Sequence, residues 1–335
     1  MTKTALKINC QQCQRVSKLI GCLNFKKTFS RREFITLAAD REIKLRAYIF
    51  CVAICHQTHT LINKKLNLKG WDYLESAFAG LAKNNSRLID PAYLVNLSTG
   101  SLAKELKIIF SEDGNPKHCT LDRLAERSKI ILEVAKVLNQ KYQNKVSNLV
   151  KQSGNRLINN GQGLYELLAE IKPYNDPLKK KSTVFIQLAA SAKLLKIKDP
   201  QNIIPPVDYH LQRVLLRLGC IEILNNNLKI KLQNRKKVKS DYELRAATVA
   251  AIKSLAPASG RDYNQLDYLF WSLGRSCCNQ KILCQDQTCN KKPCTLTLVV
   301  NLPHHDQCIF ASVCRAATDK AYRKYWQPNV ETNYY

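Results

Sequence analysis

The feature that most constrains the fold is the spacing of apolar residues, which recur at steps of three and four along much of the chain. The clearest series is Ile131, Ala135, Leu138, Tyr142, Val146 and Leu149. Lysine and asparagine lie between these positions, so the segment predicts a surface helix that buries one face. Two further helices are predicted within 41–82. Others are predicted at 165–171, 182–195, 211–218, 243–255 and 263–273. Only 295–300, which is rich in β-branched residues, predicts a strand, so we expect an all-α fold.

The chain is strongly basic. Its 335 residues include 53 lysines and arginines against 26 acidic residues, which gives a formal net charge of +27. Such a charge favours a polyanionic partner, and nucleic acid is the first candidate because Lys and Arg neutralise phosphates. An anionic membrane is the alternative, but no run reaches the roughly 20 apolar residues that a spanning helix needs. We therefore expect a soluble protein, a monomer, with no membrane partner.

The cysteines indicate a metal. Residues 1–18 are polar and basic and lack the pattern of a secretory signal, so we expect a cytoplasmic or nucleoid location, or a nuclear one in a eukaryote. In such reducing compartments the 14 cysteines are not expected to form structural disulfides. Seven of them lie close together near the C-terminus: Cys277, Cys278, Cys284, Cys289, Cys294, Cys308 and Cys314. This clustering favours metal ligation.

Four segments are predicted. Residues 1–40 form a basic arm, and 41–275 form a helical core that contains an active-site cleft. Residues 276–320 form a Cys-rich metal loop, and 321–335 form a tail. Within the core, 225–240 is rich in lysine and arginine and predicts a solvated loop.

A turn followed by two helix starts forms the candidate catalytic constellation. Residues 172–178, Lys-Pro-Tyr-Asn-Asp-Pro-Leu, run through three lysines into an amphipathic helix. Asp208 precedes a second helix that Gly219 ends, and Arg213 and Arg217 share its polar face. A carboxylate at a helix N-terminus is held in its charged form, which suits stabilisation of a sugar cation while a glycosidic bond breaks.

The segments Lys-Ser-Thr-Val-Phe at 181–185 and Pro-Val-Asp at 206–208 resemble the helix-hairpin-helix (HhH-GPD) DNA glycosylase superfamily. Their amino-acid sequences are most similar to those of the archaeal 8-oxoguanine DNA glycosylases. The resemblance implies a two-lobed helical fold, in which Lys181 forms a Schiff base and Asp208 assists it. Lys179 and Lys180 would contact phosphates, as would Arg213 and Arg217. The chain departs from the family because it lacks the Leu-Pro-Gly-Val-Gly hairpin.

An upstream segment resembles the helix of these enzymes that carries a base-contacting glutamine. Gln57 would supply the amide for the edge of a flipped base, and Trp71 or Tyr73 the aromatic ring that stacks on it. The alternative for Trp71 is a role in the core.

The C-terminal cysteine segment resembles the iron–sulfur loop of endonuclease III and the adenine glycosylases. Arg275 precedes the first cysteines, and Cys308 and Cys314 reproduce the closing C-x5-C. The resemblance implies a [4Fe–4S] cluster on Cys278, Cys294, Cys308 and Cys314, with zinc as the alternative metal and His305 as the alternative ligand. Arg275 would lie on the DNA backbone.

Together with the positive charge, the resemblance implies a base-excision-repair DNA glycosylase and AP lyase that acts on double-stranded DNA, with 8-oxoguanine as one candidate base. Two alternatives stay open: a nucleic-acid-binding metalloprotein of the same fold without catalysis, and an enzyme directed at RNA.

Overall fold

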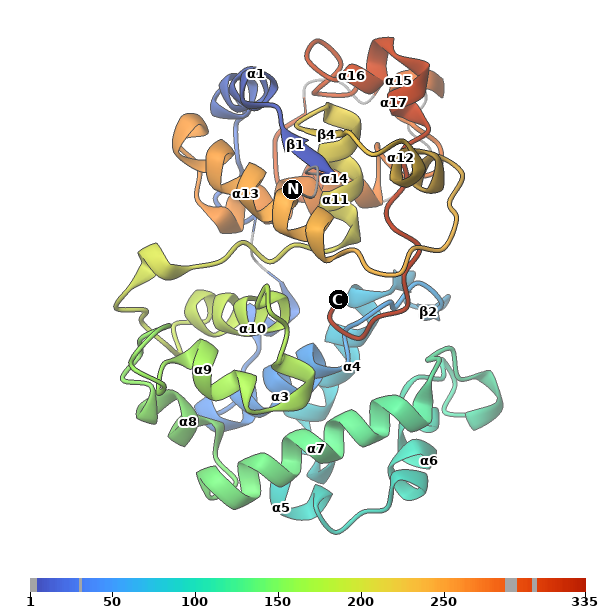
Figure 1. The fold of residues 1–335 in the computed structure, drawn as a ribbon. Helices are drawn as coiled ribbons and strands as arrows, with labels where there is room; N and C mark the ends of the chain where they lie inside the picture. The colour runs from blue at the N-terminus through green and yellow to red at the C-terminus, as the bar shows by residue number, and fades with distance from the viewer. Residues whose placement is uncertain (1–4, 30–31, 287–293, 303–305) are drawn as a thin grey trace. The chain divides into compact units, whose positions relative to one another are not determined.

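A computed structural model describes residues 5–29, 32–286, 294–302 and 306–335 (Figure 1). The chain divides into two compact units. Unit 1 comprises 1–30 and 204–331, and unit 2 comprises 31–203 and 332–335. The N-terminal segment and the last third of the chain therefore build one unit, while the middle of the chain builds the other.

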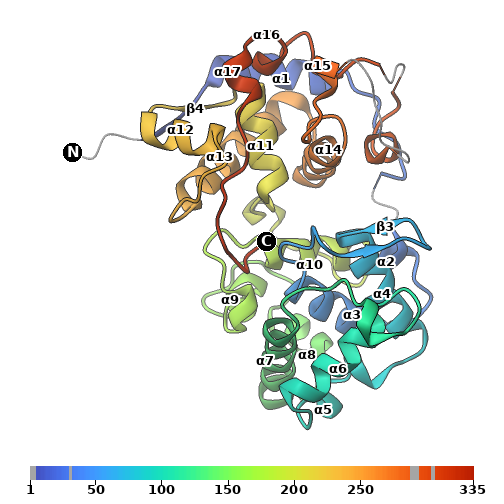
Figure 2. The same ribbon diagram turned by 90° about the vertical axis from the view of Figure 1, so that its right-hand side faces the viewer.

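Unit 2 is almost entirely helical (Figure 2). Its α-helices are α2 (Glu33–Thr36), α3 (Arg41–Ala53), α4 (Trp71–Lys83), α5 (Pro91–Leu94), α6 (Thr99–Ile109), α7 (Leu124–Tyr142), α8 (Val146–Gln152), α9 (Leu164–Ala169) and α10 (Lys180–Ser191). Short 3-10 turns are η1 (Arg87–Ile89), η2 (Pro116–His118), η3 (Lys172–Tyr174) and η4 (Pro200–Asn202). Strands β2 (Ile62–Asn63) and β3 (Leu68–Lys69) form a small antiparallel hairpin.

Helix α3 is the central helix of unit 2. Eight of its residues are buried: Leu45, Ala47, Tyr48, Ile49, Phe50, Cys51, Val52 and Ala53. It packs against α4, α10, α7 and α8. A helix that is apolar on nearly every side must be enclosed by other elements, so α3 organises this unit.

Unit 1 is also helical. Its α-helices are α1 (Cys10–Gly21), α11 (Tyr209–Leu218), α12 (Asn226–Gln233), α13 (Tyr242–Ser259), α14 (Tyr263–Arg275), α15 (Leu283–Asp286), α16 (Arg315–Thr318) and α17 (Lys320–Arg323). A 3-10 turn, η5, covers Thr295–Leu298. Strand β1 (Leu6–Ile8) pairs in antiparallel register with β4 (Ile221–Ile223), with Lys7 opposite Glu222. Residues 5–21, part of the segment expected to form an arm, thus belong to this unit.

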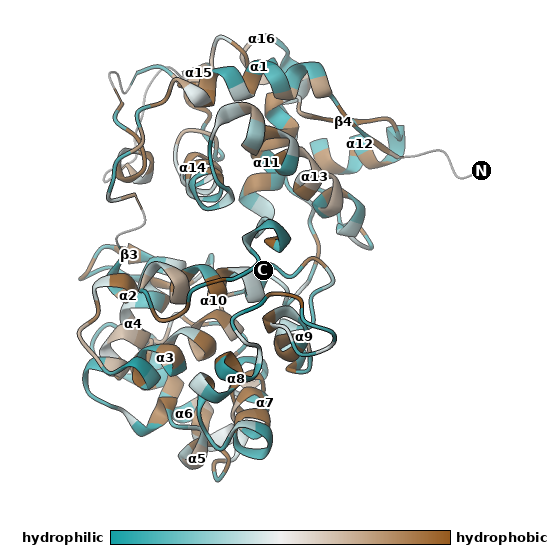
Figure 3. Ribbon diagram, turned by 90° about the vertical axis from the view of Figure 1, so that its left-hand side faces the viewer, coloured by the Kyte–Doolittle hydropathy of each residue, from teal (hydrophilic) through white to brown (hydrophobic). Residues whose placement is uncertain are grey.

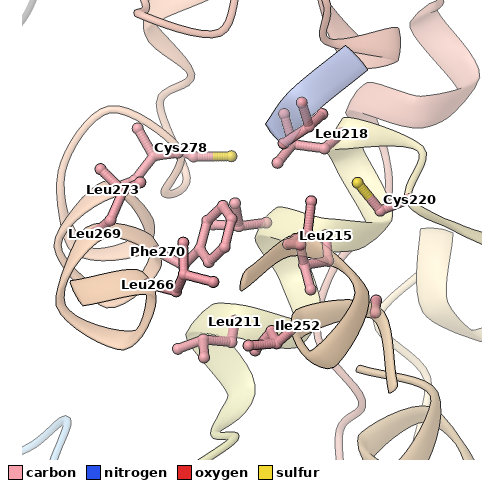
Figure 4. Close-up of a cluster of buried hydrophobic side chains, with 14 of the residues drawn as sticks. Leu211, Leu215, Leu218, Cys220, Ile252, Leu266, Leu269, Phe270, Leu273 and Cys278 are labelled. Carbon is pink, nitrogen blue, oxygen red and sulfur yellow. The ribbon is translucent and has the colours of Figure 1, made fainter. Parts of the chain in front are cut away.

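The core of unit 1 lies between α11, α13 and α14 (Figure 4). Leu211, Leu215 and Leu218 project from α11 toward Phe270 of α14 and Ile252 of α13. Most helices carry both hydrophilic and hydrophobic residues along their length, as Figure 3 shows. Amphipathic helices of this kind gain stability mainly by burying their apolar faces against one another.

The all-α prediction is confirmed, and the predicted helices are all present, with differences at their ends. One predicted helix is split: the apolar series from Ile131 to Leu149 spans α7 and α8, because the backbone at Gln143 and Asn144 turns to positive φ angles of 52° and 62°. These are left-handed conformations that end a helix. The spacing of apolar residues continues from α7 into α8, so this spacing alone did not reveal the break between the two helices.

Two local predictions are wrong. The segment expected as a strand, 295–300, forms η5, and only an isolated bridge joins Val300 to Phe25. A strand needs a neighbour along its whole length, and η5 has no such neighbour among the described residues. The segment expected as a loop, 225–240, contains α12, which Asn225 caps through Leu228 N at 2.9 Å.

No helix of the described residues combines the length and the apolar composition that crossing a bilayer would require.

We predict that Leu215→Ala destabilises the protein. Leu215 is fully buried in the unit 1 core, so its truncation should lower the free energy of unfolding by about 2–5 kcal/mol in urea denaturation. Leu224→Ala is the matched control, since the Leu224 side chain is 55% exposed and should change stability by less than about 0.5 kcal/mol. Equal losses in the two variants would contradict this assignment of the core.

Candidate functional site

In unit 2, buried cations surround the C-terminal end of α3. The last carbonyl groups of a helix lack partners within the helix and carry partial negative charge. The Lys181 ammonium group donates to Ala53 O, and the Arg127 guanidinium donates to Ile54 O and, at 3.0 Å, to His56 O. Two cations from α10 and α7 therefore satisfy three carbonyls, those of Ala53, Ile54 and His56, around the end of α3.

Lys181 is held in this position by the start of α10. Asp176, which is fully buried, accepts hydrogen bonds from Leu178 N at 3.1 Å and Lys180 N at 2.9 Å. These bonds fix the turn that leads into α10. Lys179, at the N-cap, has a left-handed φ of 58°. The Asn-Asp-Pro turn of the sequence thus orders a helix start through a buried carboxylate.

The environment of Lys181 disfavours its charge. The side chain is fully buried, and this burial, together with the nearby charges of Lys180 and Arg127, lowers the pKa of Lys181 to about 7. The Cys55 thiol acts in the opposite direction. The neighbouring Lys180 ammonium lies 3.5 Å from the Cys55 sulfur. Unit 2 therefore contains a buried amine whose pKa lies near neutral pH.

His56 is the least satisfied polar side chain of this group. It is fully buried, and within the described part of the chain neither ring nitrogen makes a hydrogen bond. Its Nε2 lies 3.2 Å from a carboxylate oxygen of Glu126, but not in hydrogen-bonding geometry. Burial, with Lys181 and Arg127 nearby, holds the pKa of His56 far below its usual range. The imidazole is therefore neutral.

Gln57 and Trp71 also lie in unit 2. Gln57 has a positive φ of 44°, and its backbone N donates to Tyr335 O at 3.1 Å. The Trp71 indole donates to Glu75 at 2.9 Å, and Arg32 lies over its ring at 5.8 Å. The indole is thus engaged with a buried carboxylate and a cation within the unit, which agrees with the alternative of a structural role for Trp71.

In unit 1, Asp208 begins α11 as the sequence predicts. Its carboxylate accepts hydrogen bonds from His210 N at 2.7 Å and Leu211 N at 3.3 Å. It is 8% exposed, and Gly219, with φ 81°, ends the helix. The rings of Tyr209 and His210 lie 4.2 Å apart directly after it. Asp208 is therefore a charged group at the positive end of a helix dipole, followed by two rings in contact.

Arg213 and Arg217 lie in a different environment from the solvent-facing one that the sequence predicts. Both are buried, at 1% and 2% exposure. Arg213 donates to Gly274 O at 2.6 Å and Arg217 to Tyr325 O at 2.9 Å, and both donate to Cys278 O. Their guanidinium groups join α11 to α14 and to the C-terminal segment, so they act inside the unit and not on a nucleic-acid surface.

The approach of α11 to α14 also explains a glycine. A Cβ at Gly274 would lie 2.9 Å from the His210 side chain, which no ordinary contact allows. The next residue, Arg275, is half-buried and places its guanidinium 4.2 Å from the centre of the Trp271 ring. Gly274 thus allows the close packing of α11 and α14, and Arg275, placed above before the cysteines of an iron–sulfur loop, packs on a ring of its own helix.

In the metal-free structure the cysteines proposed as ligands have other local partners. Cys294 is hydrogen-bonded to the Cys277 thiol, whereas the Cys278 sulfur accepts from Arg217 at 3.4 Å. Burial raises the pKa of Cys308 and of Cys314 to about 12, which favours protonated thiols. Over 5–29, 32–286, 294–302 and 306–335, no three His, Cys, Asp or Glu side chains are arranged to hold a metal ion. Cys289 and His305 lie outside the described residues.

Comparison with protein families identifies the chain. A family model described as "Queuosine salvage protein" matches residues 52–289. The match covers well over half of the chain, so the chain belongs to the queuosine salvage protein family. It includes both the cations around α3 and the Asp208 helix start. A comparison with curated proteins finds no significant match.

This membership corrects the functional predictions from sequence. The resemblance to helix-hairpin-helix DNA glycosylases is wrong as a family assignment, and so are the DNA-repair and AP lyase functions inferred from it. The description of the chain as an iron–sulfur, metal-binding protein of that family is corrected with them. Whether its cysteines take up a [4Fe–4S] cluster or zinc stays a prediction that metal analysis would test. Lys181 and Asp208 belong to different units, and each has a local role that needs no DNA.

The sequence analysis missed several residues of these groups. It did not single out Arg127, which is fully buried. Trp326, beside which Arg213 and Arg235 both lie, was assigned to a tail. Asp176 offered a signal, because an Asp-Pro pair before a helix is typical of a capped turn.

We predict that the stability of the protein rises between pH 7 and pH 10 because of Lys181. Folding lowers the pKa of Lys181 from about 10.5 to about 7, so the unfolded chain binds the additional proton in this range and stability increases with pH. Lys181→Met should remove this rise. The free energy of unfolding is measured for the wild type and the variant at each pH, and the difference between them should change from pH 7 to pH 10. Lys172→Met, at an exposed lysine near the start of the same turn, should keep it. A rise of equal slope in Lys181→Met would contradict the burial of the amine.

Proposed function

We propose that this protein acts in queuosine salvage by hydrolysing the N-glycosidic bond of a queuosine-type nucleoside, free or 5′-phosphorylated, and so releases the base. The observation that carries the proposal is the family match over 52–289. Queuosine is a ribonucleoside with a guanine-like base. Recovery of that base from the nucleoside requires the base–ribose bond to break.

The chemistry of this bond favours a carboxylate in the position of Asp208. As the base departs, positive charge develops on the ribose ring, and a fixed negative charge nearby lowers the barrier. Water adds to the anomeric carbon, one of its protons is lost, and the departing base nitrogen gains one. Asp208 is supported in this role by two backbone N–H donors and by the dipole of α11, which favour a negative charge at this position.

Two features near Asp208 support recognition of a base. Tyr209 and His210 are half-buried and follow the carboxylate directly, so an aromatic surface and a charged group come from one helix turn. Aromatic rings stack on the flat face of a base, which suits a substrate with an extended heterocycle. His210 Nδ1 lies 3.1 Å from an Arg213 nitrogen, and this contact orients its imidazole.

We predict that Asp208→Asn lowers the rate of base release by about 10²–10³-fold, the usual effect of losing one charge-stabilising group. The measurement is chromatography of free base after incubation with queuosine or its 5′-monophosphate. Asparagine also caps helices well, so α11 should remain intact.

Asp262→Asn is the matched control, because Asp262 caps α14 in the same way, accepting from Gln265 N at 2.8 Å. Its variant should keep the wild-type rate. Full activity in Asp208→Asn would refute the role of this carboxylate. Stoichiometric binding of the nucleoside with no release of base by the wild type would instead indicate a carrier protein.

A further inference from the structure

Two basic segments of unit 1 lack acidic residues. The stretch 225–240 contains six lysines and arginines and no Asp or Glu, and 320–330 contains three and none. Their exposed cations define what we call the basic surface: Arg235, Lys236, Lys237, Lys239, Lys320 and Lys324. Neither the family match, which ends at residue 289, nor the proposed hydrolysis accounts for the second segment.

The structure joins these two segments. The Gln233 side chain at the end of α12 donates to Ala321 O in α17 at 3.0 Å. Further along, Val238 N donates to Asn329 O at 3.0 Å, and the Asn329 side chain donates to Arg235 O at 3.2 Å. Figures 1 and 2 both show α12 close to α17. The cations therefore lie on one surface, although about 90 residues separate the segments in sequence.

The charges of this surface are not neutralised locally. Among the described residues, none of its six cations lies within 4.0 Å of a carboxylate. Arg235 instead lies over the Trp326 ring at 4.2 Å, and the buried Arg213 lies over the same ring at 4.4 Å. Asp241, Asp319 and Glu331 flank the two segments but form no ion pair with these six cations. Like charges gathered without ion pairs raise the free energy of the folded protein, and a bound polyanion lowers that cost.

We propose that the basic surface binds the phosphate backbone of RNA. The choice of RNA rests on the proposed function, because a ribonucleoside substrate is chemically a unit of RNA. A membrane surface fits less well. Interfacial helices insert a continuous apolar face into the bilayer, whereas α12 has eight residues and its Leu232 is already buried in unit 1.

The test uses the full-length protein and a fluorescein-labelled single-stranded 20-nucleotide RNA, with binding followed by fluorescence anisotropy between 0.05 and 0.3 M salt. The double variant Lys236→Glu/Lys237→Glu should bind at least about tenfold more weakly at 0.1 M salt. Loss of two phosphate contacts should also reduce the slope of log K against log salt by about 1.4.

Lys64→Glu/Lys65→Glu is the matched control. It reverses two adjacent exposed lysines in the β2–β3 hairpin of unit 2, so the net charge changes by the same amount. It should weaken binding by less than about threefold. Equal weakening by both variants would overturn the assignment of the surface, since net charge alone would then explain binding.

Other outcomes also refute the inference. One such outcome is no RNA binding by the wild type at 0.05 M salt. Another is affinity for single-stranded DNA of the same sequence at least about tenfold higher than for the RNA. A third is displacement of the RNA by vesicles containing phosphatidylserine. Base release is measured on the same samples. If RNA binds but no base is released, the hydrolysis proposal fails and the surface stands; if base is released without RNA binding, only the surface fails.

Discussion

Unit 2 depends on the way its central helix ends. Helix α3 is buried around most of its circumference, so its terminal carbonyls face protein and not water. Unsatisfied buried carbonyls are costly, by about 1–3 kcal/mol each. Lys181 and Arg127 meet this need from two different helices, and in doing so they fix α10 and α7 to α3. This arrangement buries two positively charged groups, which is costly. Burial lowers the pKa of Lys181 as a result.

Unit 1 uses the same principle with different residues. Arg213 and Arg217 are buried and donate to backbone oxygens of α14, of the residues after it, and of the C-terminal segment. A planar guanidinium carries several donors, so it can join three segments where a lysine would join fewer. A few buried cations therefore hold helix ends and loops together, whereas most of the 53 lysines and arginines are not buried.

The sequence predicted the fold class and most helices because apolar periodicity is a local property. It also predicted Asp208 as a helix cap and Gly219 as the helix end, which depend only on adjacent residues. It failed where the outcome depends on distant partners. Lys181 and Arg213 look like surface cations in sequence, and only the folded chain reveals that each one meets carbonyl groups from other helices. The family resemblance failed because it rested on short segments around Lys181 and Cys308, whereas the family model over 52–289 compares most of the chain.

The return of the chain to unit 1 also affects how the protein folds during synthesis. Strand β1 leaves the ribosome well before its partner β4, which follows more than 200 residues later. The intervening helices of unit 2 make mostly contacts within their own segment and can begin to collapse as they emerge. The apolar side of α1 stays exposed until α13 has been synthesised. Chaperones can therefore bind α1 of the nascent chain over a long interval.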